Sequence, residues 1–243
     1  MSVRLPVRDA ILKRQTYEAP AEGRRGKIRL DFNENTTGCS EAARKALARV
    51  SAKEWAMYPE YEEPTKMLAR YFRVHPEEIA LTNGGDDALR VFFDTFVEPG
   101  SHILVCEPTF PMYRYYAEIA GAEVVALRYT DKMEFPAETA LKALRKKPRV
   151  FFLANPNNPT GTLVSKAVVR RLLQAATDTV IVLDEATPIF PARQVLPGFA
   201  ATRTYLLPRL SRRQLEWRGF DLALYWGRES RWRWFGARCR PIP

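Results

Sequence analysis

The chain has 243 residues, of which 46% are hydrophobic, and a formal net charge of +10. This length allows one large domain or two small ones, with a substantial buried core. No apolar run reaches the roughly 20 residues of a membrane-spanning helix, and the N-terminus MSVRLPVRDAILKRQ lacks the apolar block of a secretory signal. We therefore expect a cytoplasmic protein with no membrane partner.

The positive charge is concentrated near the C-terminus. Residues 203–243 hold ten arginines against three acidic residues, a net of +7, which leaves only +3 for residues 1–202. Four of the five tryptophans lie in the same segment. Such a segment could bind nucleic acid through phosphate contacts and base stacking, but the nearly neutral remainder argues against nucleic acid as the partner.

Cysteine and histidine are too sparse to indicate a metal centre. Cys39, Cys106 and Cys239 lie far apart and form no C-x-x-C pair, so we expect reduced thiols rather than disulfides or zinc ligands. His75 and His102 are also well separated, and structural roles are expected for both. No metal site is predicted.

Hydrophobic periodicity predicts an α/β fold from Lys27 to about Asp184. In chain order, helices are expected over residues 39–50, 62–72, 86–96 and 165–176, and strands just before Thr82 and over residues 102–106, 123–127, 149–154 and 179–184. The strand runs are short and apolar, as in parallel sheets covered on both faces. After Pro188 a proline-rich stretch ends this alternation, and beyond Arg203 we assign no element.

The first stretch with chemical potential is TNGGDDAL, residues 82–89. Its two glycines allow a tight turn, and the free N–H groups at the start of the following helix suit a phosphate. Asp86 and Asp87 could instead simply cap the helix, and on this stretch alone capping is the better explanation.

The second stretch is ANPNNPTG, residues 154–161, directly after an apolar strand. Two X-Pro pairs with asparagines and a glycine make a rigid turn at the carboxyl end of a strand, where open α/β sheets bind ligands. Asparagine amides can donate to a ligand oxygen. A ligand loop is favoured over a plain turn.

The third stretch is TVIVLDEA, residues 179–186, which ends an apolar strand with Asp184 and Glu185. A buried carboxylate needs a partner because an unpaired buried charge is costly. A cationic ligand group and an internal salt bridge both satisfy this requirement, and the sequence leaves them open.

Together and in this order, these stretches resemble the fold-type I aminotransferases that use pyridoxal phosphate, most closely the histidinol-phosphate aminotransferase family. The resemblance runs from about Leu30 to Asp184 and includes LDFNENTTG, MYPEYEEPTKMLARYF, TNGGDDAL, CEPTFPMY and NPNNPTG. It implies a three-layer α/β/α sandwich, the large domain of type I pyridoxal-phosphate-dependent transferases, here incomplete. The expected divisions are an arm over residues 1–36, a partial cofactor-binding domain over 37–202 and a basic, poorly ordered tail over 203–243.

The resemblance also implies a role for individual residues. Gly84, Gly85, Asp86 and Asp87 would place backbone N–H groups on the cofactor phosphate, and Phe110 would stack on the pyridine ring. Asn158 would hydrogen-bond the phenolic oxygen, and Asp184 would pair with the protonated pyridine nitrogen so that the ring can act as an electron sink.

Further residues would serve the substrate and a second subunit. Tyr58 would reach the phosphate of the neighbouring subunit's cofactor, which implies a homodimer, and Asn33, Glu34 and Asn35 would lie near the substrate. The implied substrates are small amino acids and 2-oxo acids: L-histidinol phosphate and 2-oxoglutarate would give imidazole acetol phosphate and glutamate. The narrower substrate assignment stays open, because other aminotransferases share the cofactor motifs.

Three features depart from the family pattern. Thr187 stands where the family has a tyrosine that bonds the phenolic oxygen, and the arm reads NENTTG rather than N-E-N-P. The Schiff-base lysine is also missing: Ser211 is followed by Arg212, and no lysine follows Lys166. An arginine stays protonated at working pH and cannot replace this lysine. We therefore expect no catalytic residue in this chain.

The composition after Arg203 suggests why the lysine is missing. Codons can be chosen for RRQLEWRGFDLALYWG so that another reading frame gives AATGVAGFRFGAVLG, close to the family's segment. We infer a frameshift after about Ser211 that also removes the family's C-terminal domain. The expected function is therefore an aminotransferase by descent, inactive as written. A non-catalytic fragment that binds pyridoxal phosphate is the alternative.

Overall fold

A computed structural model describes residues 6–12, 22–29, 32–33, 38–72, 75–186 and 204–207. These residues fall into two compact units, one that contains the described residues up to Glu60 and one that begins at Tyr61. The first unit holds the short helices α1 (Asp9–Leu12), α2 (Glu41–Leu47) and α3 (Ala52–Trp55). The second unit holds every described strand and the remaining helices.

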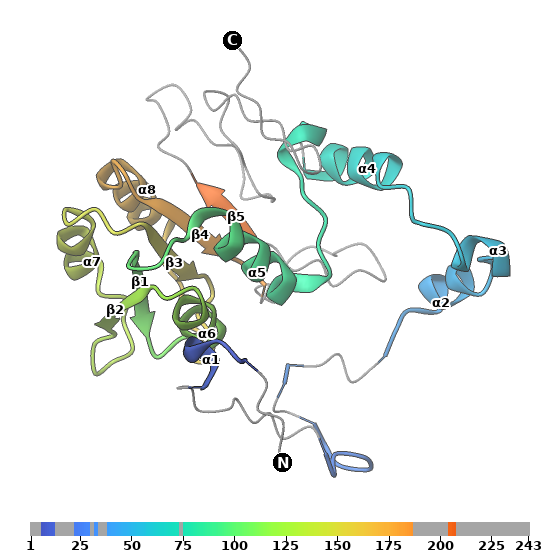
Figure 1. Cartoon of the computed structure of the whole chain (residues 1–243), viewed down its shortest axis with the longest axis horizontal. Coiled ribbons are helices and arrows are strands. Elements are labelled where there is room, and N and C mark those ends of the chain that lie inside the picture. The colour runs from blue at the N-terminus through green and yellow to red at the C-terminus, as the bar shows by residue number, and fades with distance from the viewer. Residues whose placement is uncertain are drawn as a thin grey trace. The chain divides into compact units, whose positions relative to one another are not determined.

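The second unit is built on one five-stranded sheet in the order β2-β1-β3-β4-β5 (Figure 1). Its strands are β1 (His102–Glu107), β2 (Glu123–Arg128), β3 (Val150–Ala154), β4 (Val180–Asp184) and β5 (Thr204–Leu207). The first four pair in parallel, with Ala154 opposite Asp184, whereas β5 pairs antiparallel with β4. Because β1, β3 and β4 are parallel, their carboxyl ends meet at one edge of the sheet.

Helices cover both faces of this sheet. The helices of the second unit are α4 (Glu62–Phe72), the 3₁₀ helix η1 (Pro76–Glu78), α5 (Gly84–Phe96), α6 (Met112–Ile119), α7 (Ala137–Leu144) and α8 (Lys166–Ala175). The α5 and α6 side chains pack with Ile103, Phe152 and Val182 on one face. The α7 and α8 side chains pack with Phe151 and Ile181 on the other. The three-layer α/β/α class predicted from the sequence is therefore confirmed.

Local sequence explains where several helices begin. Ser40, Ser51 and Ser165 are the N-caps of α2, α3 and α8, and each side chain accepts a hydrogen bond from a backbone N–H in the first turn. At α3 Glu54 completes a capping box with Ser51. Such caps satisfy N–H groups that the helix itself cannot bond.

Two expectations about strands need correction. The segment before Thr82 is not a strand: Ile79 is extended, but residues 79–83 pair with no neighbour within the described part of the chain. An extended segment becomes a strand only when a partner bonds its backbone. In addition, β2 is not covered on both faces, because it is the edge strand and leaves Glu123, Val125 and Ala126 exposed.

The structure contains a helix with the predicted bounds and elements that were not predicted. The helix predicted over residues 62–72 is found as α4 with those bounds. The helices α6 and α7, which connect β1 to β2 and β2 to β3, were not predicted. A strand, β5, occupies Thr204–Leu207, where no element was assigned. The proposed division at residues 36 and 202 stays a prediction.

Candidate functional site

The candidate site lies at the carboxyl edge of the sheet, where the chain leaves β1, β3 and β4. Asp184 is the last residue of β4, and Asn155 follows β3 directly. The Asn155 N–H donates to the Asp184 carbonyl oxygen at 2.8 Å. This bond continues the pairing of β3 with β4 into the loop that carries NPNNPTG.

Asp184 is a buried carboxylate with two hydrogen-bond donors. Its side chain is held by the Tyr113 hydroxyl, which donates to Oδ2 at 2.7 Å, and by the Ala186 backbone N–H, which donates to Oδ1 at 2.9 Å. Burial raises the pKa of Asp184, the two hydrogen bonds oppose this, and the Asp86 carboxylate adds to the rise.

No cation compensates this carboxylate within the described residues. Asp184 is 7% exposed, yet none of the ion pairs found in the described part of the chain includes it. The internal salt bridge considered from the sequence is thus not found there. A buried carboxylate with two donors and no cation is suited to a cationic ligand group.

Aromatic rings pack on the face of the sheet that α5 and α6 cover. Tyr113 is 1% exposed and stacks on Phe152 with ring centroids 4.9 Å apart. Phe110, partly buried, meets Tyr113 edge to face at 5.7 Å. Burial, Asp184 and its hydrogen bond all raise the pKa of Tyr113, so the hydroxyl stays protonated and remains a donor. Phe110, the residue predicted to stack on the pyridine ring, therefore contacts Tyr113, which in turn bonds Asp184.

A buried amide ties the loop after β1 to the loop after β3. The Asn157 side chain donates to the Pro108 carbonyl oxygen at 2.9 Å and accepts from the Thr109 hydroxyl at 2.7 Å. Asn158, the next residue, is half-buried, and its side chain makes no hydrogen bond within the described ranges. The Asn158 amide is therefore free to bond a ligand.

The first turn of α5 contains the predicted phosphate residues. Gly84 has φ +80°, a conformation that favours glycine. Asn83 is the N-cap and makes no side-chain capping bond, while its backbone N–H donates to the Asp87 carboxylate at 3.0 Å. This bond, followed by Arg90, lowers the pKa of Asp87. Asp87 thus serves the helix start, as the capping alternative anticipated, and no described side chain accepts from the N–H groups of Gly85 or Asp86.

Other predicted site residues belong to the first unit or lie outside the described residues. Tyr58 is 98% exposed and, with Asn33 at φ 54°, belongs to the first unit. Glu34, Asn35, Thr187, Ser211 and Arg212 lie outside the described residues. The roles predicted for all of these residues stay predictions.

Sequence reasoning missed Tyr113, Thr109 and Asn157. Tyr113 follows Phe110 at a spacing of three residues at the start of a helix, which places the two rings close together. That spacing was a usable signal. The partners of Asn157 and Asp184, by contrast, lie 48 and 71 residues away in the chain.

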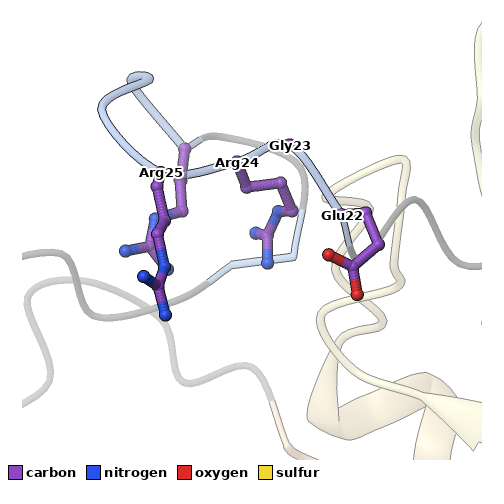
Figure 2. A pocket seen from close by; sticks show the side chains of 5 residues that line it. Glu22, Gly23, Arg24 and Arg25 are labelled. Atoms are coloured by element: carbon purple, nitrogen blue, oxygen red, sulfur yellow. The ribbon is translucent and has the colours of Figure 1, made fainter.

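A separate hollow of about 460 Å³ lies in the first unit, lined by Glu22, Gly23, Arg24, Arg25 and Arg29 (Figure 2). The Arg24 guanidinium lies over the Phe32 ring, 4.2 Å from its centroid. None of the predicted cofactor residues lines this hollow.

Both histidines have identified neighbours in the described ranges. His75 is the N-cap of η1, and His102 lies 3.2 Å from the Glu123 carboxylate on the neighbouring strand. No three His, Cys, Asp or Glu side chains gather into a possible metal site in the part of the chain that the structure describes. Within the same part, no helix is both long and apolar enough to cross a membrane.

Comparisons with known proteins identify the family of the chain. The sequence model of the aminotransferase class I and II family matches residues 25–190. Curated histidinol-phosphate aminotransferases are similar, for example those of Roseiflexus castenholzii (34% identity, covering 73% of this chain and 51% of the relative) and Ruminiclostridium cellulolyticum (32%, 75% and 53%). The chain spans about half the length of the curated relatives it matches.

Solved structures give the same result. The histidinol-phosphate aminotransferase of Sinorhizobium meliloti, in complex with pyridoxal-5'-phosphate, superimposes with a TM-score of 0.68 at 26% identity over 76% of this chain and 52% of that one. A Thermus thermophilus aspartate aminotransferase mutant shares the fold, with a TM-score of 0.62 at 20% identity, over 73% of this chain and 58% of that one. The chain belongs to the class I and II aminotransferase family.

Proposed function

We propose that this chain binds pyridoxal phosphate at the carboxyl edge of its sheet, as an aminotransferase by descent. The observation that carries the proposal is Asp184, a buried carboxylate with two hydrogen-bond donors and no cationic partner among the described residues. A protonated pyridine nitrogen is the cation that such a group is suited to hold.

The neighbouring residues fit the rest of the cofactor. Phe110 offers an aromatic face to a flat ring, and Asn158 has an unused amide for the phenolic oxygen. Gly85 and Asp86 offer N–H groups at a helix start, where a phosphate is stabilised. When bound, pyridoxal phosphate would supply the electron sink that amino-group transfer requires.

Asp184 would act on that chemistry by holding a proton on the ring. Burial raises the pKa of its carboxyl, and a cationic group beside it would favour the ionised form again. The Tyr113 hydroxyl donates to Oδ2 of the Asp184 carboxylate. This bond fixes the orientation of the carboxylate and also favours its ionised form. Tyr113 and Asp184 would together keep the ring nitrogen protonated.

We also propose that the chain holds the cofactor without a covalent link and does not catalyse transamination. The last lysine in the sequence is Lys166, the first residue of α8, and Arg212 follows Ser211 where the family has its lysine. Arginine does not give up a proton near neutral pH and cannot act as the nucleophile or shuttle protons.

The substrate proposal concerns the active aminotransferase from which the chain descends: histidinol phosphate, with 2-oxoglutarate as the amino acceptor. It is supported by the names of the similar curated enzymes, at identities of 32% and 34%. Aminotransferases for other amino acids share the fold at lower identity, so an amino acid of another class is the alternative substrate. A homodimer in the cytoplasm completes the proposal, and the 98% exposure of Tyr58 leaves that side chain available to a second subunit.

One titration tests the core of this proposal. The chain is titrated with pyridoxal phosphate and its absorbance and fluorescence are followed, then borohydride is added and the protein mass is measured. We expect saturable binding, no borohydride-stable adduct and no transamination of histidinol phosphate. An adduct on one specific lysine would overturn the non-covalent proposal, and absence of saturable binding would overturn the cofactor site itself.

A further inference from the structure

Asn157 connects two loops that leave different strands. From the loop after β3 its side chain reaches Pro108 and Thr109, which precede Phe110 in the loop after β1. The same amide donates to the Thr160 hydroxyl at 2.8 Å within its own loop. The two loops are 48 residues apart in the chain, so this amide couples segments that are otherwise distant in sequence.

The amide of Asn157 has little capacity left for a ligand. Its side-chain nitrogen makes two hydrogen bonds, its side-chain oxygen makes one, and the residue is 3% exposed. Its backbone N–H donates to the Thr162 carbonyl oxygen, and its own carbonyl oxygen accepts from the Gly161 N–H. A buried amide with both donors used therefore serves the protein itself.

We propose that Asn157 is a positioning residue that fixes the distance between Phe110 and Asn158 and so sets how tightly the site holds the cofactor ring. This inference rests on the proposed function. Phe110 follows Thr109 directly and Asn158 follows Asn157 directly. The Thr109–Asn157 hydrogen bond therefore joins the chain neighbours of the residue that stacks on the ring and of the residue that bonds its phenolic oxygen.

The physical reason is the precision that such a site needs. Groups that grip one rigid ring from two loops must keep their geometry to about 0.5 Å, which requires supporting contacts behind them. The Thr109–Asn157 bond of 2.7 Å and the Asn157–Pro108 bond of 2.9 Å are contacts of this kind, since they connect residues just before Phe110 and Asn158 in the two loops. Without them each loop would relax independently.

The same loop supplies a matched control, Asn155. It is 7% exposed, and its amide makes two hydrogen bonds with the Val164 backbone. No hydrogen bond of its side chain reaches Pro108 or Thr109 in the described residues. Asn155→Ala therefore removes a buried asparagine of the NPNNPTG loop but leaves the connection to the Phe110 turn in place.

The experiment measures affinity for two ligands, pyridoxal phosphate and its analogue with a methylated phenolic oxygen. The variants are Asn157→Ala, Asn155→Ala, Thr109→Val and Thr109→Ser. We expect Asn157→Ala and Thr109→Val to bind pyridoxal phosphate about tenfold more weakly, because both remove the buried Thr109–Asn157 hydrogen bond, and to lose the preference for it over the analogue. Thr109→Ser keeps the hydroxyl and should retain both properties, as should Asn155→Ala.

Two results would overturn the inference. One is an equal loss of affinity in Asn157→Ala and Asn155→Ala with the ligand preference unchanged, because general destabilisation does not discriminate between the two ligands. The other is a Thr109→Val variant that binds like the unsubstituted chain. Thr109→Val alters only one hydroxyl, so it decides the question even where Asn157→Ala unfolds.

Hydrogen exchange separates this inference from the proposed function. In the cofactor-free chain, Asn157→Ala should speed amide exchange over residues 109–115 as well as in its own loop, whereas Asn155→Ala should affect its own loop alone. If the unsubstituted chain binds no pyridoxal phosphate, the proposed function and the cofactor role of Asn157 both fail, and faster exchange over 109–115 still establishes the coupling. Unchanged exchange there overturns the coupling itself.

Discussion

The Tyr113 hydroxyl donates a 2.7 Å hydrogen bond to the Asp184 carboxylate, and both side chains are buried. Tyr113 lies on α6 and Asp184 ends β4, so the bond joins a helix on one face of the sheet to the edge where the chain leaves β1, β3 and β4. In the described part of the chain the Asp184 carboxylate has no cationic partner. Its charge is stabilised there by two hydrogen bonds, one from Tyr113 and one from the Ala186 N–H.

Tyr113→Phe should therefore weaken both the fold and cofactor binding. Loss of a buried hydrogen bond to a charged group is expected to cost about 1–3 kcal/mol of unfolding free energy. The Tyr113 bond lowers the pKa of Asp184, so its removal raises that pKa. Under the proposed function, binding of pyridoxal phosphate requires ionised Asp184 and is lost as the pH falls through this pKa. The acid limb of the binding curve should move to higher pH, as measured by titration at several pH values.

Tyr129→Phe is the matched control for this variant. Tyr129 is also buried, burial raises its pKa, and it packs in the core cluster on the opposite face of the sheet. Its hydroxyl makes no hydrogen bond to Asp184, so the pH dependence of binding should not change. An acid limb that shifts equally in both variants would contradict the role given to Tyr113.

Asp184→Asn should separate stability from binding. Burial raises the pKa of Asp184 above its ordinary value of 3.8, so the folded chain retains this proton at pH values where the unfolded chain has lost it. Stability from this group therefore falls as the pH rises from about 3.8 through the folded pKa, and stays lower above it. The asparagine variant removes that loss, so its free energy of unfolding should rise by about 1 kcal/mol at neutral pH. Its affinity for pyridoxal phosphate should fall by about 30-fold or more.

Two measurements test this prediction: urea unfolding between about pH 3 and 8, and cofactor titration at neutral pH. The pH range spans the titration of carboxyl groups with ordinary and with raised pKa values. Asp178→Asn is the control, because Asp178 forms an exposed ion pair with Lys147 at 2.7 Å and such pairs contribute little. A variant at Asp184 that loses stability and keeps its affinity would contradict both halves of this prediction.

The fold and the site were predictable from the sequence to different extents. The strands β1, β3 and β4 and the helices α4, α5 and α8 follow from local periodicity, and NPNNPTG and Asp184 were placed correctly at strand ends. The strand expected before Thr82 fails because pairing depends on a distant partner. The Tyr113–Asp184 and Thr109–Asn157 contacts could not be predicted for a similar reason: they depend on which strands become neighbours.

Cys106 should be chemically inert in the folded chain. Its thiol lies in β1 at 3% exposure, and burial raises its pKa to about 12. The thiolate is the reactive form, so near neutral pH almost none of this side chain can react. A variant that keeps Cys106 and replaces Cys39 and Cys239 with serine should react with a thiol reagent only after addition of denaturant. Cys39 is exposed, and a variant that keeps it alone should react at once; rapid labelling of Cys106 without denaturant would show that β1 is not buried.

Gly84→Ala tests whether the start of α5 serves the ligand as well as the helix. Gly84 has φ +80°, and a Cβ there meets no atom within 4 Å, so the cost to folding is conformational, about 1–2 kcal/mol. Gly100 has the same φ of +80° and the same open surroundings, and it lies in the turn before β1. Gly100→Ala should therefore lose similar stability in urea unfolding. Only Gly84→Ala should also weaken pyridoxal phosphate binding, because strain at Gly84 displaces the neighbouring N–H groups of Gly85 and Asp86, which are proposed to hold the phosphate. Equal affinity in the two variants would place the phosphate elsewhere.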